Sequence, residues 1–413
     1  MDDHRSRTID DILLDQAEKC DNSGMGISCE IHYFQGRSQP HGDPLDVAFN
    51  VKWKPRAAGS LRCYGLFSGF NGSARHAITA ANSMFYQLAL NNESSISADD
   101  DDETIFSYLE DAFDAAKRDV NHDIKNKQSQ KKILEISQEG QQSEYKEKID
   151  ELDIDIKAGT TVLTALIIER RLYVLNCGNS RLLLVTSENN KPCCDALIDV
   201  HDFKNKMDAT RVTNAGLEIT HEMHNMSSRG IGDPQHQKDF AEPGNGYLTQ
   251  EPDVFQYKIE PNWQYLILLS TGVVKCVKEC MQRREEREIS EREVNNQIME
   301  YVLHETKNSF SHSYTSKAQA TVDLIGRIHF ESFNRGELRT RVRDGMSLIL
   351  VDLTNPTATE YPVSQLETQL SLQEIQSEIL PYADMNDFES RVTEDSIQEL
   401  LDLNLFERSD LLP

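Results

Sequence analysis

A glycine-rich stretch, 64-YGLFSGFNG-72, has the residue types of a turn that holds a metal ion or a phosphate group. Gly69, Asn71 and Gly72 let the backbone reach left-handed conformations and come close to a ligand. The apolar residues before them favour a strand that leads into the turn. The turn itself contains no carboxylate and no histidine, so its side chains supply neither a charged metal ligand nor a proton donor.

Histidines and cysteines elsewhere in the chain do not form a recognised metal motif. His221 and His224 lie three residues apart in 221-HEMHNM-226 but lack the HExxH order, so a polar surface loop is expected. Cys276 and Cys280 are a helical turn apart, and no CxxC pair is present. We therefore expect free thiols, no metal ion and no other cofactor. The eight cysteines are at positions 20, 29, 63, 177, 193, 194, 276 and 280.

Hydrophobic periodicity predicts the elements that position these residues. Strands are expected at 27–34, 47–53, 61–67, 160–168, 171–177, 181–187, 264–270 and 346–353. Helices are expected from Ala74 onward, over 105–120, at 288–307 and at 316–334. Short breaks within 160–187 favour tight antiparallel pairing of its three strands. The polar residues 121–156 are expected to form an exposed helical excursion or a mobile insertion.

The composition excludes several classes of partner. The chain has 413 residues, 38% of them hydrophobic, which is enough for a sizeable core. Its 43 Lys and Arg against 69 Asp and Glu give a net charge of −26, which disfavours nucleic acid and anionic lipid as partners. The N-terminus lacks an apolar signal-peptide core, and no run approaches the length of a membrane span. We expect a reduced, cytoplasmic protein without membrane insertion.

Five short motifs occur together in an order that resembles the metal-dependent serine/threonine phosphatases of the PPM (PP2C) family. They are 65-GLFSGFNG-72, 173-YVLNCGNSR-181, 228-SRGIGD-233, 268-LLSTGVVKCV-277 and 343-RDGMSLILV-351. The resemblance covers residues 25 to 353 approximately. It implies an α+β fold with four layers, in which two antiparallel β-sheets pack together and are flanked by helices. Family members hydrolyse phosphoesters with two Mg²⁺ or Mn²⁺ ions held by carboxylates.

The matching positions in this chain lack the residues for that chemistry. Ser68 stands where the family has its bridging aspartate, and Phe70 stands where it has a histidine resembling a general acid. Two further metal positions are occupied by Asn179 and Thr271. Asp344 is the only retained ligand-type residue, and 37-RSQPHGDPLD-46 offers no convincing match to the family's N-terminal Glu-Asp pair. The resemblance therefore implies a pseudophosphatase, whose remaining glycines serve its turns.

Other functions stay open at this point. A residual phosphatase would need a metal bound by Asp344 and by ligands that the alignment does not reveal. A phosphopeptide-binding module would use a basic pocket, for which Arg181 and Arg229 are candidates, although both are also suited to structural ion pairs. His201 lies where the family often has an Asp-His pair, and we expect it to support the fold.

The C-terminal stretch 381-PYADMNDF-388 resembles the docking segment of one PP2C-like subgroup. That subgroup lost its metal ligands and serves as an adaptor that binds and activates the TGF-β-activated kinase, a MAP kinase kinase kinase. The resemblance makes this stretch the partner-binding site, either in that role or as part of a helix over 381–406 that packs on its own domain. The implied contact residues are Pro381, Tyr382, Ala383, Asp384, Met385, Asp387 and Phe388.

The residue types of this segment suit a helix that docks in a groove. Pro381 suits the first position of a helix, and Asp384 lies in its first turn, where the helix dipole favours negative charge. Tyr382, Met385 and Phe388 recur every three residues and share one helical face.

These patterns divide the chain into four regions. Residues 1–25 form a lead-in, 26–353 a phosphatase-like domain, 354–380 a linker and 381–413 a kinase-docking segment. The resemblance implies a role in MAP kinase signalling of the TGF-β-like, stress, immune or Wnt-linked kind. The core could also recruit other signalling proteins.

Overall fold

A computed structural model gives the structure of the chain. It describes residues 25–28, 46–53, 61–90, 96–97, 99–137, 144–189, 191–237, 246–285, 287–308, 317–336, 338 and 345–353. The lead-in up to residue 24, Asp344, the linker at 354–380 and the docking segment at 381–413 lie outside these residues. None of the helices in the described part combines the length and the hydrophobicity needed to span a bilayer.

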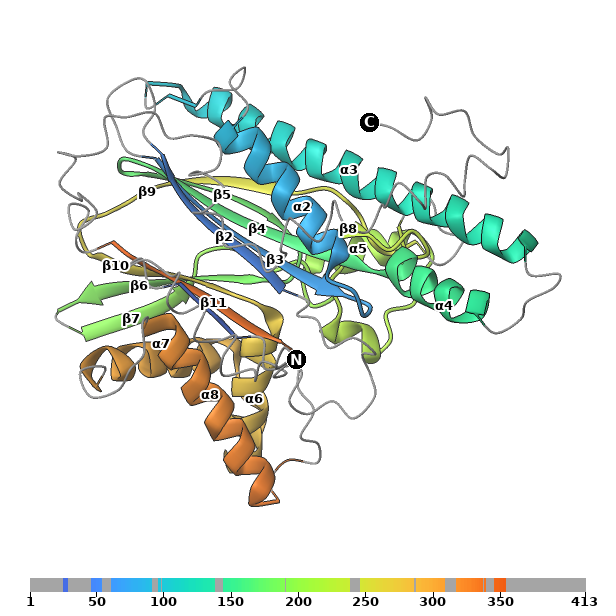
Figure 1. Cartoon of the computed structure of the whole chain (residues 1–413). Coiled ribbons are helices and arrows are strands. Elements are labelled where there is room, and N and C mark those ends of the chain that lie inside the picture. The colour runs from blue at the N-terminus through green and yellow to red at the C-terminus, as the bar shows by residue number, and fades with distance from the viewer. Residues whose placement is uncertain are drawn as a thin grey trace, which may run out of the picture. The chain divides into compact units, whose positions relative to one another are not determined.

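Two antiparallel β-sheets form the centre of the domain (Figure 1). The five-stranded sheet has the order β1-β11-β10-β6-β7. Its strands are β1 (Met25–Ser28), β11 (Met346–Asp352), β10 (Trp263–Leu269), β6 (Arg181–Glu188) and β7 (Lys191–Ala196). The other sheet has the order β2-β3-β4-β5-β9, and β8 pairs with β4. Its strands are β2 (Asp46–Trp53), β3 (Leu61–Phe70), β4 (Gly159–Ile168), β5 (Arg171–Cys177), β8 (Ile231–Gly232) and β9 (Asp253–Lys258).

Helices cover the outer faces of both sheets (Figure 1). The β2–β3 sheet is covered by α2 (Arg75–Phe85), which continues into the π-helix η2 (Tyr86–Leu90), and by α3 (Asp102–Ser137). The other sheet is covered by α6 (Thr271–Glu285), α7 (Glu291–Asn308) and α8 (Lys317–Asn334). The short helices α5 (Lys206–Asn214) and η4 (Glu222–Asn225) lie between β7 and β8 in the chain. This arrangement confirms the predicted α+β sandwich.

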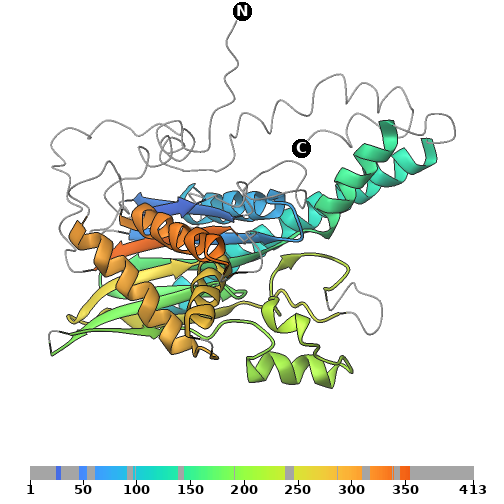
Figure 2. The same cartoon turned by 90° about the horizontal axis from the view of Figure 1, so that it is seen from below.

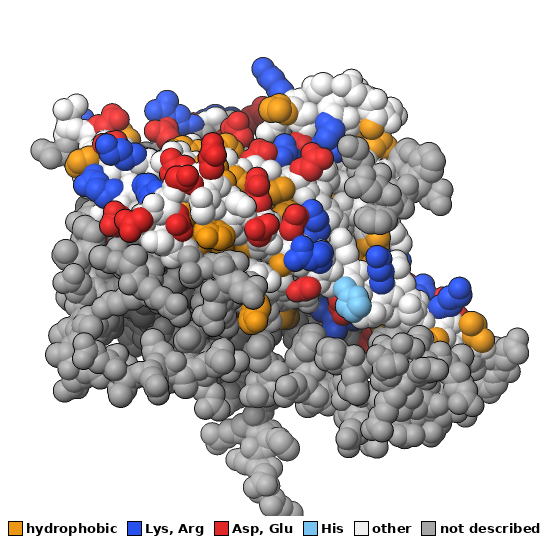
Figure 3. Space-filling view, turned by 90° about the horizontal axis from the view of Figure 1, so that it is seen from above, with side chains coloured by type: hydrophobic (Ala, Val, Ile, Leu, Met, Phe, Trp, Pro, Cys, Tyr) orange, Lys and Arg blue, Asp and Glu red, His pale blue; other side chains and the backbone are white. Residues whose placement is uncertain are grey.

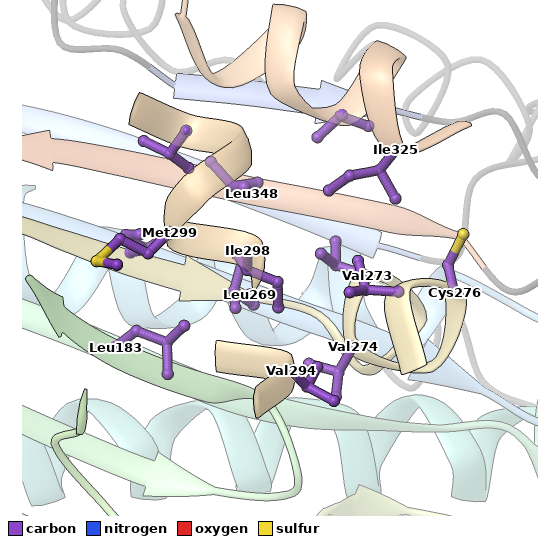
Figure 4. Packing of buried hydrophobic residues seen from close by; sticks show 14 of the residues in the cluster. Leu183, Leu269, Val273, Val274, Cys276, Val294, Ile298, Met299, Ile325 and Leu348 are labelled. Carbon is purple, nitrogen blue, oxygen red and sulfur yellow. The ribbon is translucent and has the colours of Figure 1, made fainter. Parts of the chain in front are cut away.

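Burial on both faces explains why the central strands read as apolar runs. Every residue of β4 is buried, because one face meets the other sheet and the opposite face meets helices. On the other side of the domain, α6, α7 and α8 pack their apolar faces against the five-stranded sheet. Figure 4 shows Val273 and Val274 of α6 among Val294, Ile298 and Leu348 in this cluster.

Two sequence predictions about local structure are wrong. The strands at 171–177 and 181–187 do not pair with each other, because β5 and β6 belong to different sheets. The chain crosses between the sheets at Gly178, Asn179 and Ser180. The glycine-rich stretch at 65–72 was expected to turn after Phe67. Instead, β3 continues to Phe70 and the turn begins at Asn71.

Within the predicted insertion, residues 121–137 form the second half of α3, and residues 144–156 form most of α4 (Glu144–Lys157). Figure 2 shows α3 and α4 side by side, extending beyond the ends of the strands. Two lysines of α3 attach α4: Lys127 Nζ lies 2.5 Å from Asp155 Oδ2, and Lys131 Nζ lies 2.5 Å from Asp153 Oδ1. Ser73 also donates to Asp155, with 2.7 Å between the oxygens, which joins α4 to the start of α2.

The two ion pairs differ in burial, and this difference is testable. The Lys127 side chain is 7% exposed and that of Lys131 is 26% exposed. Asp155→Asn leaves a buried ammonium without its carboxylate, and we expect the free energy of unfolding to fall by about 2 kcal/mol. The matched control Asp153→Asn should cost about 0.5 kcal/mol, because its pair is more solvated. Urea unfolding measures the free energy of unfolding of both variants. Equal losses would contradict the prediction that the Asp155 ion pair contributes more to stability than the Asp153 pair.

Candidate functional site

The site predicted from sequence lies at the end of β3, where the strand meets α2. Ser68 of β3 is in register with Thr161 of β4 on one side and with Asp46 of β2 on the other. The stretch 37–46 offers no convincing match to the family's N-terminal Glu-Asp pair, but its last residue, Asp46, lies opposite Ser68 in the strand register. The turn that follows uses left-handed backbone, with φ of 62° at Asn71 and 95° at Gly72.

Phe70, which the resemblance aligns with the family's histidine, is partly buried and packs against neighbouring segments. Its ring lies so close to Gly159 that a Cβ added there would meet Cζ at 2.3 Å. The ring also contacts a small cluster of buried apolar residues that joins α5 to the loop before β9. The cluster consists of Phe203, Val212, Tyr247 and Leu248. Phe70 therefore contributes packing, and its phenyl ring carries no proton to transfer.

Asn71 ties the turn to two neighbouring segments. Its Nδ2 donates to Asp233 Oδ2 at 2.9 Å and to the backbone carbonyl of Lys157 at 3.1 Å. Asp233 Oδ2 also lies 2.8 Å from His236 Nδ1. Burial raises the pKa of Asp233, an effect that the hydrogen bonds from His236 and Asn71 oppose. A neutral amide thus holds the turn in place.

Asn179 and Thr271, which the resemblance aligns with metal-binding aspartates, bind each other. Thr271 Oγ1 donates to Asn179 Oδ1 at 2.9 Å, although the residues are 92 positions apart in the chain. Thr271 begins α6, and Asn179 lies in the crossing from β5 to β6. Both groups are neutral, so this contact needs no cation between them.

The loops around this hydrogen bond are closely packed. At Gly178, φ is 151°, and an added Cβ would lie 2.3 Å from Thr161 Cβ. Thr161 Oγ1 lies 3.3 Å from Ser180 Oγ, and both side chains are buried. A side chain at position 178 would therefore displace Thr161 from the strand next to Ser68.

His201 supports the same crossing. Its Nδ1 accepts from the backbone N–H of Gly178 at 3.1 Å, so Nε2 carries the proton that is donated to Asp253 Oδ2 at 2.9 Å. The hydrogen bond from His201 lowers the pKa of Asp253 to about 2, and Arg229 adds to the effect. His201 is fully buried, which fits the support role expected from the sequence.

The two arginines proposed for a phosphate pocket are engaged in ion pairs. Arg181 donates to Glu291 Oε2 at 2.6 Å and to Asn295 Oδ1 at 2.5 Å. Arg229 donates to both oxygens of the buried Asp208 and, at 2.8 Å, to Asp253 Oδ1. The guanidinium groups of Arg181 and Arg229 are therefore engaged in contacts within the domain.

The remaining candidates from the sequence do not converge on a metal site. Within the described residues, no group of three or more His, Cys, Asp and Glu side chains is arranged to hold a metal ion. His221 and His224 form an edge-on ring pair at η4, with centroids 5.9 Å apart. Six of the eight cysteines are described, and all six are free thiols.

Comparison with known proteins identifies the family. The sequence profile of Protein phosphatase 2C matches residues 81–309, which is more than half of the chain. The chain therefore belongs to the Protein phosphatase 2C family.

The chain is also similar to individual proteins and to a solved structure. The chain is 27% identical to "TGF-beta-activated kinase 1 and MAP3K7-binding protein 1" of Caenorhabditis elegans, over 95% of this chain and 98% of that protein. It is 34% identical to Protein phosphatase 2C homolog 2 of Schizosaccharomyces pombe, over 29% of this chain and 32% of that protein. A solved serine-threonine phosphatase 2C from Toxoplasma gondii aligns with 77% of this chain and 97% of its own, at 14% identity and a TM-score of 0.47.

The described residues do not fit the two-metal centre that the resemblance implies. Hard divalent cations need carboxylate oxygens, and the side chains at the matched positions are a hydroxyl, an amide and a second hydroxyl. The amide oxygen of Asn179 is already occupied by Thr271. A neutral hydrogen bond joins two of the positions at which the resemblance implies charged metal ligands.

Restoring the carboxylates tests this interpretation. In the double variant Asn179→Asp, Thr271→Asp, two like charges replace a 2.9 Å hydrogen bond. We expect the free energy of unfolding in a chelator to fall by about 1–2 kcal/mol, because adjacent carboxylates repel. Manganese should recover part of this loss by binding the folded state. Thermal melts with and without Mn²⁺ measure both effects.

Two controls accompany this experiment. Wild-type protein should show no manganese-dependent shift. Asn126→Asp adds a carboxylate on the exposed side of α3 and should also show none. A wild-type melting temperature that rises with Mn²⁺ as steeply as that of the double variant would contradict the assignment.

Proposed function

We propose that this chain is a catalytically inactive PP2C-like adaptor that binds and activates a MAP kinase kinase kinase of the TGF-β-activated type. The observation that carries the proposal is the hydrogen bond from Thr271 to Asn179, which replaces charged ligands by a neutral pair. Phe70 adds support, because its ring fills the position of a proton donor with apolar packing. The scaffold is kept while the hydrolytic groups are absent from the matched positions.

The similarity to the Caenorhabditis elegans protein supports the kinase as partner. That protein's name describes it as binding a TGF-beta-activated kinase, and the match covers 95% of this chain. The uncovered 5% amounts to about 21 of 413 residues, fewer than the 25 that follow Phe388. The matched region therefore extends past the segment 381–388, which lies outside the described residues.

We assign kinase binding to 381-PYADMNDF-388. Tyr382, Met385 and Phe388 on one helical face would fill a groove of the kinase, and Asp384 would meet a basic residue at its rim. Ala383 and Asp387 complete the segment, with Pro381 at the helix start. The phosphatase-like domain would present this segment and recruit further signalling proteins in the cytoplasm.

The alternative function, a phosphopeptide-binding module, has less support from the structure. It requires guanidinium groups that are available to a phosphate, whereas Arg181 and Arg229 are held by Glu291, Asp208 and Asp253. On the face covered by α2 and α3, acidic and basic side chains of the described residues are interspersed (Figure 3).

A kinase-binding assay with tail variants tests the proposal. We would co-express a TGF-β-activated-type kinase domain with wild-type chain, Tyr382→Ala, Phe388→Ala and a truncation after Leu380. All three altered chains should lose co-purification and kinase autophosphorylation, with at least a tenfold loss of affinity because aromatic anchors dominate such interfaces.

Phe406→Ala is the matched control, since it removes an aromatic ring from the same C-terminal region but outside the proposed contact residues 381–388. It should leave binding unchanged. Undiminished binding by the truncated chain would overturn the docking assignment.

A further inference from the structure

A buried histidine lies where α2 meets the helices that extend beyond the sheets. His76 is the second residue of α2, and its side chain is 0% exposed. Its Nδ1 lies 2.8 Å from the carbonyl oxygen of Ala158, the residue between the end of α4 and the start of β4. Its Nε2 lies 3.8 Å from Asp123 Oδ2 on α3. We call residues 121–137 of α3 together with α4 the α3–α4 arm. Both ring nitrogens of His76 therefore face the arm or the residue that follows it.

The hydrogen bond to Ala158 fixes which ring nitrogen of His76 carries the proton. A carbonyl oxygen only accepts, so Nδ1 of the neutral ring is protonated and Nε2 carries a lone pair. That lone pair has no hydrogen-bond donor among the described residues. The Asp123 carboxylate that faces it is itself an acceptor. The neutral ring thus leaves a buried acceptor unsatisfied, which is rare in native proteins.

Charged groups from three helices surround the ring. Asp123 and Lys127 come from α3, Asp155 comes from α4, and Arg75 precedes His76 on α2. Arg75 binds the Asp123 carboxylate at both oxygens, with Nε donating to Oδ2 at 2.9 Å and Nη2 to Oδ1 at 3.2 Å. The carboxylate of Asp155 is bound by Lys127. Both acidic partners of His76 are therefore already engaged by cations.

The strand β8 and the residue after it close another side of the ring. A Cβ on Gly232 would lie 3.0 Å from His76 Nδ1, so the backbone of β8 packs directly against the imidazole. The next residue, Asp233, donates its backbone N–H to the same Ala158 carbonyl oxygen, at 2.8 Å. Its carboxylate accepts from Asn71. A proton on Nε2 would therefore place a positive charge on a ring that has no exposed surface.

Burial and the nearby carboxylates act on His76 in opposite directions. Burial lowers the pKa of His76, and the charge of Lys127 acts in the same direction. The hydrogen bond to Ala158 and the charges of Asp123 and Asp155 oppose this effect, but the net direction is downward from 6.5. The closed junction thus binds a proton less tightly than an opened junction in which water reaches the ring.

We propose that His76 is a proton-sensitive latch: uptake of a proton by its ring releases the α3–α4 arm from α2. The neutral ring holds the base of the arm through its hydrogen bond to Ala158. Protonation adds a second donor, Nε2–H, at a carboxylate that Arg75 already occupies. The stability that the neutral ring contributes is present above pH 6.5 and is lost as the pH falls through the lower pKa of the closed state.

Hydrogen exchange of the full-length protein, followed by mass spectrometry between about pH 7.5 and about pH 5, tests the latch. After correction for the intrinsic pH dependence of amide exchange, peptides from α4 should exchange faster as the pH falls below 6.5. One titrating group limits the increase to about tenfold per pH unit. Peptides from β10, in the other sheet, are the internal reference and should show no such increase.

Three substitutions make the result specific to His76. His76→Asn keeps an amide that can donate to Ala158 but cannot titrate, so the pH dependence at α4 should disappear. Asp123→Asn removes a carboxylate that raises the pKa of His76, so the arm should open at a lower pH. His122→Asn is the matched control, because it removes an exposed histidine from the adjacent position of α3. It should leave the pH profile of α4 unchanged.

The proposal is overturned if α4 of the wild-type protein exchanges at the same corrected rate throughout this pH range. It is also overturned if His76→Asn keeps the wild-type pH profile. Should that variant fail to fold, an unchanged midpoint in Asp123→Asn overturns the proposal instead. None of these outcomes involves kinase binding, so the proposed function is tested independently.

Discussion

The hydrogen bond between Thr271 and Asn179 is the contact on which the rest of this site depends. It joins the crossing from β5 to β6 with the start of α6. Carboxylates at these two positions would repel each other unless a cation lay between them. With a hydroxyl and an amide, the same backbone arrangement is held by a neutral bond worth about 1 kcal/mol.

Contacts next to this hydrogen bond hold the adjacent loops in place. Asn71 fixes the β3–α2 turn by donating to Asp233, and His201 fixes the β5–β6 crossing by accepting from Gly178. Phe70 fills the space beside Gly159. In the described residues, the β3–α2 turn and the β5–β6 crossing are thus attached by hydrogen bonds and apolar packing.

The sequence predicted most of the strands because their hydrophobic periodicity is local. It did not predict that β5 and β6 belong to different sheets, since a short break between two strands is also typical of a hairpin. It missed α6, because Ser270 was assigned to the preceding strand and the first turn of the helix contains Gly272 and the β-branched Val273 and Val274, which have low helix propensity. The positions that are expected to be degenerate were identified from their motifs. The hydrogen bond between Thr271 and Asn179 was not predicted, because these two residues are 92 positions apart in the chain. Assignment of the docking segment rests on sequence alone, because residues 381–388 lie outside the described part of the chain.

A crystal structure of the protein grown in manganese chloride, with anomalous data collected at the manganese edge, tests the central claim most directly. The account predicts no anomalous peak among Ser68, Asn179 and Thr271, and it predicts the Thr271–Asn179 hydrogen bond in the electron density. A manganese peak at that place, with Asn179 and Thr271 turned toward the ion, would contradict the proposal that a neutral contact stands in place of the metal centre.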